Sequence, residues 1–262
     1  LALNAAISQN PGPNLILWPE APVPFYYETD AFLRDQTAQL ARLTRSSVLF
    51  AGVGRAPGGG PYNSAYMLDS AGQLLGRYDK MYLVPFGEFV PPPFDLFVHQ
   101  ISDEAGAFVP GRTLRTFAAS SQRVGMFICY ESAFPHFVRE FAASGATVLA
   151  NLSNDGYFGT SAAREQHLLL VRMRAAENRR WVIRATNDGI TATVDPAGRV
   201  AHRLPAYREM AARTRFSHRR DRMPYTEYGD WFAWGCLAGA VGLAAAVILR
   251  QDRASAESRR SS

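Results

Sequence analysis

Three residues that could act together in catalysis each follow a short, mostly apolar run. Glu20 follows Leu-Ile-Leu-Trp-Pro, Lys80 follows Gly-Arg-Tyr-Asp, and Cys129 follows Gly-Met-Phe-Ile. Such runs are typical of strands, and sites in α/β proteins form where strands end. A carboxylate can take the proton of a thiol, the thiolate can attack a carbonyl carbon, and an ammonium group can stabilise the resulting oxyanion. Each residue alone is unremarkable, but the combination predicts acyl-transfer chemistry.

The lysine stands out because the chain has 27 arginines and only this one lysine. A coding bias toward arginine accounts for the general replacement, since either cation serves on a solvated surface. Lysine differs in being a compact charge that can also lose its proton. Composition alone leaves two alternatives open: Lys80 survived by chance, or its position requires an amine.

The remaining pattern predicts alternating strands and helices around these residues. The chain has 262 residues, of which 47% are hydrophobic, and this is enough to form a substantial core. A chain that is mainly disordered is therefore excluded. Helices are expected at Ala31–Arg45, His136–Ala143 and Ala163–Asn178. Strands are expected at Leu15–Trp18, Val48–Val53, Ser64–Asp69, Gln73–Tyr78, Leu114–Ala118, Arg123–Ile128, Thr147–Leu152, Trp181–Ala185, Ile190–Val194 and Arg199–Arg203. This order predicts an α/β fold with helices outside a sheet core.

Between Pro85 and Pro110 the periodic pattern breaks down. This stretch contains three consecutive prolines and four phenylalanines that look exposed: Phe86, Phe89, Phe94 and Phe97. Long loops in compact domains are often functional lids. We therefore predict that this aromatic loop is a functional lid.

The segment Trp231–Leu249 has no charged residue over 19 positions. As a helix it would reach about 28 Å at roughly 1.5 Å per residue, close to the thickness of a bilayer core. Tryptophans at its start and Arg250 at its end are typical of a transmembrane helix; the alternative is a buried helix of a soluble protein. Both flanks are basic, so charge alone does not set the orientation. Cys236 lies in this segment, so we do not expect it to pair with Cys129.

Longer stretches of the sequence resemble the nitrilase, or carbon-nitrogen hydrolase, superfamily, whose members use Glu, Lys and Cys in this order. More narrowly, they resemble the apolipoprotein N-acyltransferase family. The stretches that carry the resemblance are Gly76–Lys80, Val84–Pro91, Cys129–Glu131, Asn151–Gly159, Gln166–His167 and Arg184–Thr191.

The resemblance implies a nitrilase-like α-β-β-α sandwich followed by one C-terminal transmembrane helix. It implies a catalytic domain over residues 1–228, the membrane helix over 229–250 and a polar basic tail over 251–262. The resemblance also places the protein in the bacterial cytoplasmic (inner) membrane, with the catalytic domain on the periplasmic side. In that family another strand precedes the one at Leu15, and a bundle of helices precedes the domain. We predict that this segment lacks both, and we expect it alone to be inactive or poorly folded.

The implied reaction moves an acyl chain from a phospholipid, through a Cys129 thioester, to the α-amino group of the diacylglyceryl-cysteine of an apolipoprotein. In it Glu20 would be the base and Lys80 the oxyanion partner, while Glu88 would hold Lys80. Tyr130 and Glu131 would support the nucleophile. The part of the aromatic loop from Phe86 to Phe97 would face the membrane and admit acyl chains, with simple packing onto the domain as the alternative. The resemblance implies no cofactor and no metal. The partners it implies are the phospholipid donor, the diacylated apolipoprotein and the membrane.

Three other functions remain as alternatives. The first is a membrane-tethered carbon-nitrogen hydrolase, an amidase in which water resolves the thioester. The second is a membrane-tethered binding module that keeps the fold without the chemistry. The third is nucleic-acid binding, which the net charge of +5 favours only weakly because the arginines are scattered; no nucleic-acid partner is expected.

Overall fold

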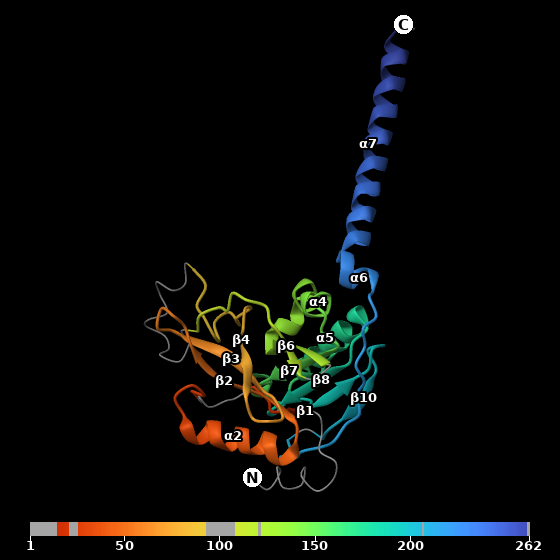
Figure 1. Cartoon of the computed structure of the whole chain (residues 1–262). Helices are drawn as coiled ribbons and strands as arrows, with labels where there is room; N and C mark the ends of the chain where they lie inside the picture. Colours follow the sequence, from red (N-terminus) through yellow and green to blue (C-terminus); the bar gives the residue numbers. More distant parts are fainter. Residues whose placement is uncertain (1–14, 21–25, 93–107, 120–121, 206, 261–262) are drawn as a thin grey trace.

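Two β-sheets lie face to face between outer helices, and one long helix leaves the domain (Figure 1). The computed structural model describes residues 15–20, 26–92, 108–119, 122–205 and 207–260. The layers form an α-β-β-α sandwich, so the α/β class expected from the sequence is confirmed. The strand predicted to be missing ahead of Leu15 concerns residues outside this description.

The first sheet has the order β1-β2-β3-β4. Strand β1 pairs with β2 in parallel, and the other pairs are antiparallel. Helix α2, Ala31–Thr44, packs on the outer face against β2 and β3; it begins at Asp30, whose carboxylate accepts the backbone N–H of Leu33 at 2.9 Å. The strands are β1 (Leu15–Leu17), β2 (Ser47–Arg55), β3 (Pro61–Leu68) and β4 (Leu74–Asp79).

The second sheet has the order β10-β9-β8-β7-β6-β5, with β6, β7 and β8 parallel. Helices α4 (Pro135–Ala143) and α5 (Ala163–Asn178) cover its outer face. The strands are β5 (Thr116–Ala119), β6 (Gln122–Ile128), β7 (Val148–Ser153), β8 (Val182–Thr186), β9 (Ala192–Val194) and β10 (Val200–Arg203).

Strand β2 shows why the layers stack in this way. Successive side chains of a strand point to opposite faces. Leu49 and Ala51 join the core between the two sheets, whereas Val48 and Phe50 join the core under α2. Both faces of β2 are therefore covered, and only its last residue is exposed. A strand buried on both faces appears in the sequence as a continuous apolar run rather than an alternating one.

Strand and helix positions follow the sequence-based expectations to within about three residues at each end. The short elements were not predicted. They are η1 (Cys129–Ala133), η2 (Gly156–Phe158) and α6 (Pro224–Tyr228), each too short to show helical periodicity.

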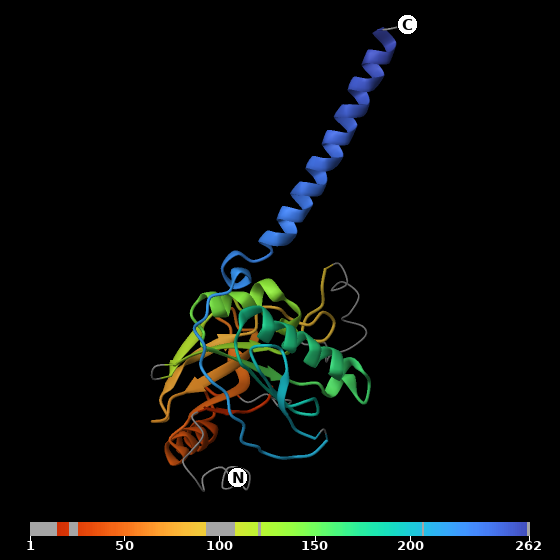
Figure 2. The ribbon, with the colours of Figure 1, turned by 90° about the vertical axis from the view of Figure 1, so that its right-hand side faces the viewer.

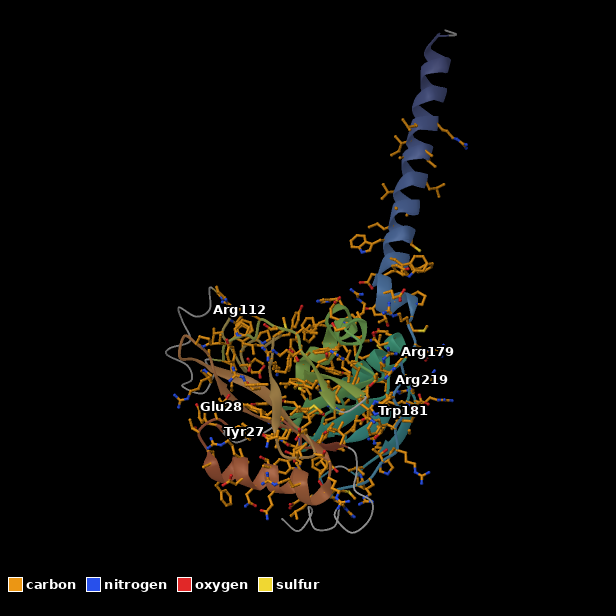
Figure 3. All side chains as sticks on the ribbon, viewed as in Figure 1. Tyr27, Glu28, Arg112, Arg179, Trp181 and Arg219 are labelled. Carbon is orange, nitrogen blue, oxygen red and sulfur yellow. The ribbon has the colours of Figure 1, made fainter. Side chains whose placement is uncertain are left out.

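Helix α7, Trp231–Arg260, projects from the domain, and the ribbon has no other described element beside most of its length (Figure 2), while Figure 3 shows side chains extending from the part nearer the domain. Its stretch Trp231–Arg250 is long and apolar enough to cross a membrane, and 0% of the most apolar window is buried. The alternative of a buried helix in a soluble core is therefore wrong for these residues. The helix continues beyond Leu249 because residues 251–260 contain no glycine or proline. Cys236 on this helix and Cys129 in the core are both free.

The predicted aromatic loop is described in part, as residues 85–92 and 108–110. Phe86 is 57% exposed and Phe89 is half-buried. Phe94 and Phe97 lie outside the described residues. In both views the described part of this loop and α4 lie at the end of the domain from which α7 leaves (Figures 1 and 2).

Candidate active site

Glu20, Lys80 and Cys129 line one cavity of about 1080 Å³. Glu20 follows β1 and Lys80 follows β4, both in the first sheet, whereas Cys129 follows β6 in the second. Each backbone is held by a strand, and the side chains meet where the ends of the two sheets face each other. Residues more than 100 positions apart in the sequence thus share one site.

Two carboxylates and one amine form a buried cluster on the first sheet. The Lys80 Nζ lies 2.9 Å from the carboxylate of Glu88 and 3.4 Å from that of Glu20. The Asn63 Nδ2 donates at 2.6 Å to Glu20 Oε1 and to Glu88 Oε1, the same two oxygens that the amine approaches, so the amide joins the two carboxylates. Lys80 is only 1% exposed, and this cluster satisfies its charge without solvent.

The backbone around Lys80 is fixed on both sides. Its N–H donates to the carbonyl of Asn63 at 2.8 Å, and its carbonyl accepts the N–H of Gly111 at 2.7 Å. A Cβ at position 111 would lie 2.1 Å from the carbonyl oxygen of Asp79, so only glycine permits this approach. The residues at the end of the aromatic loop therefore pack directly against the end of β4.

Glu88 is held by its own turn. Its Oε2 accepts the N–H of Val84 at 2.8 Å, and its backbone N–H donates to the carbonyl of Val84 at 2.8 Å. Its carbonyl accepts the N–H of Phe108 at 3.1 Å. The aromatic loop thus places Glu88 beside Lys80. The hydrogen bond from Phe108 to Glu88 joins the end of the loop to its beginning.

Glu20 connects the two sheets. Its Oε2 accepts the backbone N–H of Asn154 at 2.8 Å, and its carbonyl accepts the Asn187 Nδ2 at 2.7 Å. Asn154 follows β7 and Asn187 follows β8, so both donors come from the second sheet. The carboxylate is therefore held close to the sheet that carries Cys129.

Cys129 stands at the junction of β6 and η1 with a φ of 47°, in the left-handed region that residues with a side chain rarely adopt. Its Sγ lies 4.0 Å from the carbonyl oxygen of Asn154, whose N–H is bound by Glu20. Burial and the charge of Glu20 raise the pKa of the Cys129 thiol to about 12, against the lowering effect of Lys80. The resting thiol is therefore protonated, and a base must take its proton before sulfur can attack.

Charge at Lys80 is favoured in spite of its burial. Burial alone would lower the pKa of Lys80, but the charges of Glu20 and Glu88, together with that of Cys129 when it is a thiolate, raise it well above its usual value. The amine remains a cation at physiological pH. A buried cation at the wall of this cavity is suited to stabilising an oxyanion on a bound carbonyl group.

Glu131 is a buried carboxylate that ties the end of β6 to the end of β4. Its Oε2 accepts the N–H of Ile128 at 2.7 Å, while its Oε1 accepts the hydroxyl of Tyr78 at 2.6 Å and the backbone N–H groups of Met81 at 2.7 Å and Tyr82 at 3.2 Å. Burial raises the pKa of Glu131 to about 7, whereas these donors act in the opposite direction. Glu131 therefore sets the distance between the residues preceding Cys129 and those following Lys80.

The cavity has an aromatic rim and an apolar wall. Tyr130 is 36% exposed and Tyr157 is 86% exposed, and together with Phe86 they line it. Its wall includes Val53 and Leu170. Such a cavity suits a substrate that is apolar over most of its length and has one reactive polar group.

Cys129, Asp155 and His167 each place one possible metal-ligand atom within 4.8 Å of the others. Both ring nitrogens of His167 are engaged, Nδ1 with Asp155 Oδ1 at 2.9 Å and Nε2 with the carbonyl oxygen of Cys129 at 3.0 Å. Arg184 occupies the other carboxylate oxygen of Asp155. These contacts form a hydrogen-bonded network and leave no histidine nitrogen for a metal.

Two functional contacts were not foreseen from the sequence. Asn63 bridges the carboxylates of Glu20 and Glu88, and the backbone of Asn154 lies between Glu20 and Cys129. Asn63 is an ordinary polar residue near a strand end, and only the hairpin register that pairs Ser64 with Asp79 sets it beside Lys80. Asn154 acts through its backbone, which carries no sequence signal of its own.

Comparison with known proteins agrees with this geometry. A model of the carbon-nitrogen hydrolase family matches residues 1–214. The chain belongs to this family. Its nitrilase-type fold is also found in an amidase of the nitrilase superfamily from Nesterenkonia AN1, with a TM-score of 0.60 and 22% identity over 78% of this chain and 79% of that one.

Within the carbon-nitrogen hydrolase family, the curated relatives that the chain matches are apolipoprotein N-acyltransferases. The protein from Geobacter metallireducens is 34% identical over 92% of this chain and 47% of its own length. The protein from Bordetella bronchiseptica is 34% identical over 93% of this chain and 48% of its own length. The chain thus resembles these enzymes over nearly all its residues and spans about half their length.

Proposed function

We propose that this protein is an N-acyltransferase that moves an acyl chain from a phospholipid to the α-amino group of a diacylglyceryl-cysteine at the N-terminus of an apolipoprotein. The observation that carries the proposal is the meeting of Glu20, Lys80 and Cys129 in one largely apolar cavity. The 34% identity to named apolipoprotein N-acyltransferases over nine tenths of the chain supports the choice of substrates.

In the first half-reaction Glu20 takes the proton of the Cys129 thiol, and sulfur attacks the ester carbonyl carbon of the phospholipid. Lys80 stabilises the negative charge that develops on the carbonyl oxygen. The carbon–oxygen ester bond then breaks, and the proton held by Glu20 passes to the departing alkoxide. Lysophospholipid leaves, and the acyl group stays on Cys129 as a thioester.

In the second half-reaction the free α-amino group attacks the thioester carbonyl carbon, and Glu20 takes a proton from the attacking nitrogen. The carbon–sulfur bond breaks, an amide forms, and the thiol is restored. One site that takes two substrates in turn predicts ping-pong kinetics. In this scheme Glu88 and Asn63 hold Lys80 and Glu20, and Glu131 and Tyr130 support the nucleophile.

Helix α7 is the basis for the proposed cellular location of the protein. We propose that residues 1–228 form the catalytic domain, that residues 229–250 cross the bacterial inner membrane, and that residues 251–262 form the tail. Exposed Trp231 and Trp234 at the start of α7 suit a membrane interface. The aromatic loop lies at the end from which α7 leaves, so the cavity would take its lipid from the periplasmic leaflet.

The choice of acceptor can be tested by competition in the intact protein in bacterial membranes. With labelled phospholipid as donor, a diacylated lipopeptide with a free α-amino group should gain the labelled acyl chain. The same lipopeptide with an acetylated amine is the matched control and should gain none. Mass spectrometry of the lipopeptide measures both.

The amidase alternative gives the opposite pattern. It expects release of ammonia from a simple amide such as butyramide, with no label on the lipopeptide. That result would overturn the proposed acceptor, because water rather than an amine would then resolve the thioester.

A further inference from the structure

A buried ionic network lies behind Cys129, and the proposed reaction does not use it. Arg184 on β8 and Asp155 after β7 form an ion pair of 2.6 Å with both side chains fully buried. His167 on α5 is 6% exposed and contacts both Asp155 and Cys129. The Ser153 hydroxyl completes the cluster by donating to Asp155 Oδ1 at 2.8 Å.

The hydrogen bonds determine where one proton of His167 lies. The carbonyl oxygen of Cys129 can only accept, so the Nε2 at 3.0 Å carries a hydrogen. Burial would raise the pKa of Asp155, but His167 and Arg184 hold it well below its usual range. The Nδ1 lies 2.9 Å from Asp155 Oδ1 and 3.2 Å from Arg184 Nη2, so polar contacts hold the ring on that side as well.

Arg184 stabilises this arrangement from the far side. Its Nη2 lies 2.6 Å from Asp155 Oδ2 and 3.2 Å from the Nδ1 of His167. The shorter contact is the one to the carboxylate, so Asp155 lies between Arg184 and the imidazole ring and orients the ring. Position 189 must remain glycine here, because a Cβ would lie 2.1 Å from Asp155 Oδ2.

The contact to Cys129 falls at a strained point of the backbone. Cys129 has a φ of 47°, and such conformations persist only where the surroundings hold them. The carbonyl that His167 binds belongs to the same residue, directly after the strained torsion. Rotation of this peptide would move Sγ relative to Glu20 and Lys80.

We propose that His167 is a positioning residue for the nucleophile: its Nε2–H holds the Cys129 carbonyl and thereby keeps Sγ aimed at the bound ester, while Asp155 and Arg184 fix the ring. This inference rests on the proposed role of Cys129. A purely structural role would instead depend on the Nδ1 contact, which ties α5 to the end of β7.

Two substitutions separate these roles. In His167→Gln the side-chain amide nitrogen occupies the place of Nε2 and keeps the donor toward Cys129. In His167→Asn the amide nitrogen occupies the place of Nδ1 and keeps only the donor toward Asp155. His202→Asn on β10, which is exposed, is the control. The measurement is the rate of acyl-thioester formation in a single turnover by the intact protein in membranes, at saturating phospholipid.

We expect the glutamine variant to keep most of the wild-type rate and the asparagine variant to lose about 10- to 100-fold, with KM for phospholipid unchanged in both. The control should match wild type. Rates are compared below the unfolding temperature of every variant. Equal rates in the two variants, or a faster asparagine variant, would overturn the inference while leaving the thioester mechanism intact. Absence of a thioester in wild type would instead overturn the proposed function.

Discussion

Replacing Glu20 with glutamine should abolish acyl transfer and at the same time make the Cys129 thiol more acidic. Loss of a general base costs about 10²- to 10⁴-fold in rate. The glutamine keeps the shape of the side chain, and its single carbonyl oxygen can still accept the N–H of Asn154, whereas its amide nitrogen replaces the oxygen that accepts from Asn63. We expect the fold to survive the loss of this one hydrogen bond together with the base.

The acidity of the thiol follows from its surroundings. Burial is the main cause of the raised pKa of Cys129, and the negative charge of Glu20 is the next. Removing that charge lowers the pKa, so more thiolate exists at any pH below about 12. Glu20→Gln should react with iodoacetamide faster than wild type at pH 8 while transferring no acyl chain.

The measurement is the rate of carboxamidomethylation at Cys129 followed by mass spectrometry across a pH series. Glu140→Gln, an exposed carboxylate on α4, is the control and should leave both rates unchanged. Slower alkylation together with lost transfer would indicate a collapsed site rather than a missing base, and would contradict this account of Glu20.

Replacing Lys80 with methionine should also abolish transfer, but with the opposite effect on the thiol. Lys80 lowers the pKa of Cys129, so its removal raises that pKa further and slows alkylation. Loss of an oxyanion partner costs about 10²- to 10³-fold in rate. Breaking a buried charge pair also destabilises the fold by about 3–5 kcal/mol, since Glu20 and Glu88 would then face each other without a cation.

Arginine at position 80 should not restore activity. The guanidinium group is planar and larger than an ammonium group, and the site leaves Lys80 only 1% exposed. Transfer and alkylation rates of Lys80→Met and Lys80→Arg, measured beside Glu20→Gln, provide the check. Substantial transfer by the arginine variant would show that any cation suffices, contrary to the compact cluster described here.

Much of the fold could be predicted because its strands are continuous apolar runs. Residues 124–128 of β6 and all of β7 are buried, and most of these residues are apolar. The sequence also predicts the membrane-type helix, because Trp231–Leu249 contains no charged residue. The helical elements of three to five residues cannot be predicted in this way, because helical periodicity needs a longer window.

Candidate site residues were predictable only where a reactive side chain follows a strand. This pattern predicts Glu20, Lys80 and Cys129, and in the structure all three line one cavity. Asn63 could not be found in this way, because its contact with Glu20 and Glu88 depends on hairpin register. The register of a strand pair is a property of the assembled sheet, not of a local pattern.

The buried network shows a second limit. Asp155, His167 and Arg184 lie in stretches that resemble the family, yet their spacing along the chain suggests no common task. They meet because the parallel strands β7 and β8 end at the same edge under α5. Only the packing of three separate elements turns them into a single hydrogen-bonded unit.

The central claim is a thioester at Cys129, and trapping it is the most direct test. The intact protein in membranes is incubated with phospholipid carrying an isotope-labelled acyl chain, without acceptor, and then quenched in acid and digested. The account predicts a labelled acyl group on the Cys129 peptide that neutral hydroxylamine releases and a diacylated lipopeptide removes. Cys236→Ala should keep the label and Cys129→Ala should lose it. Acyl transfer to the lipopeptide by Cys129→Ala at the wild-type rate would contradict the claim.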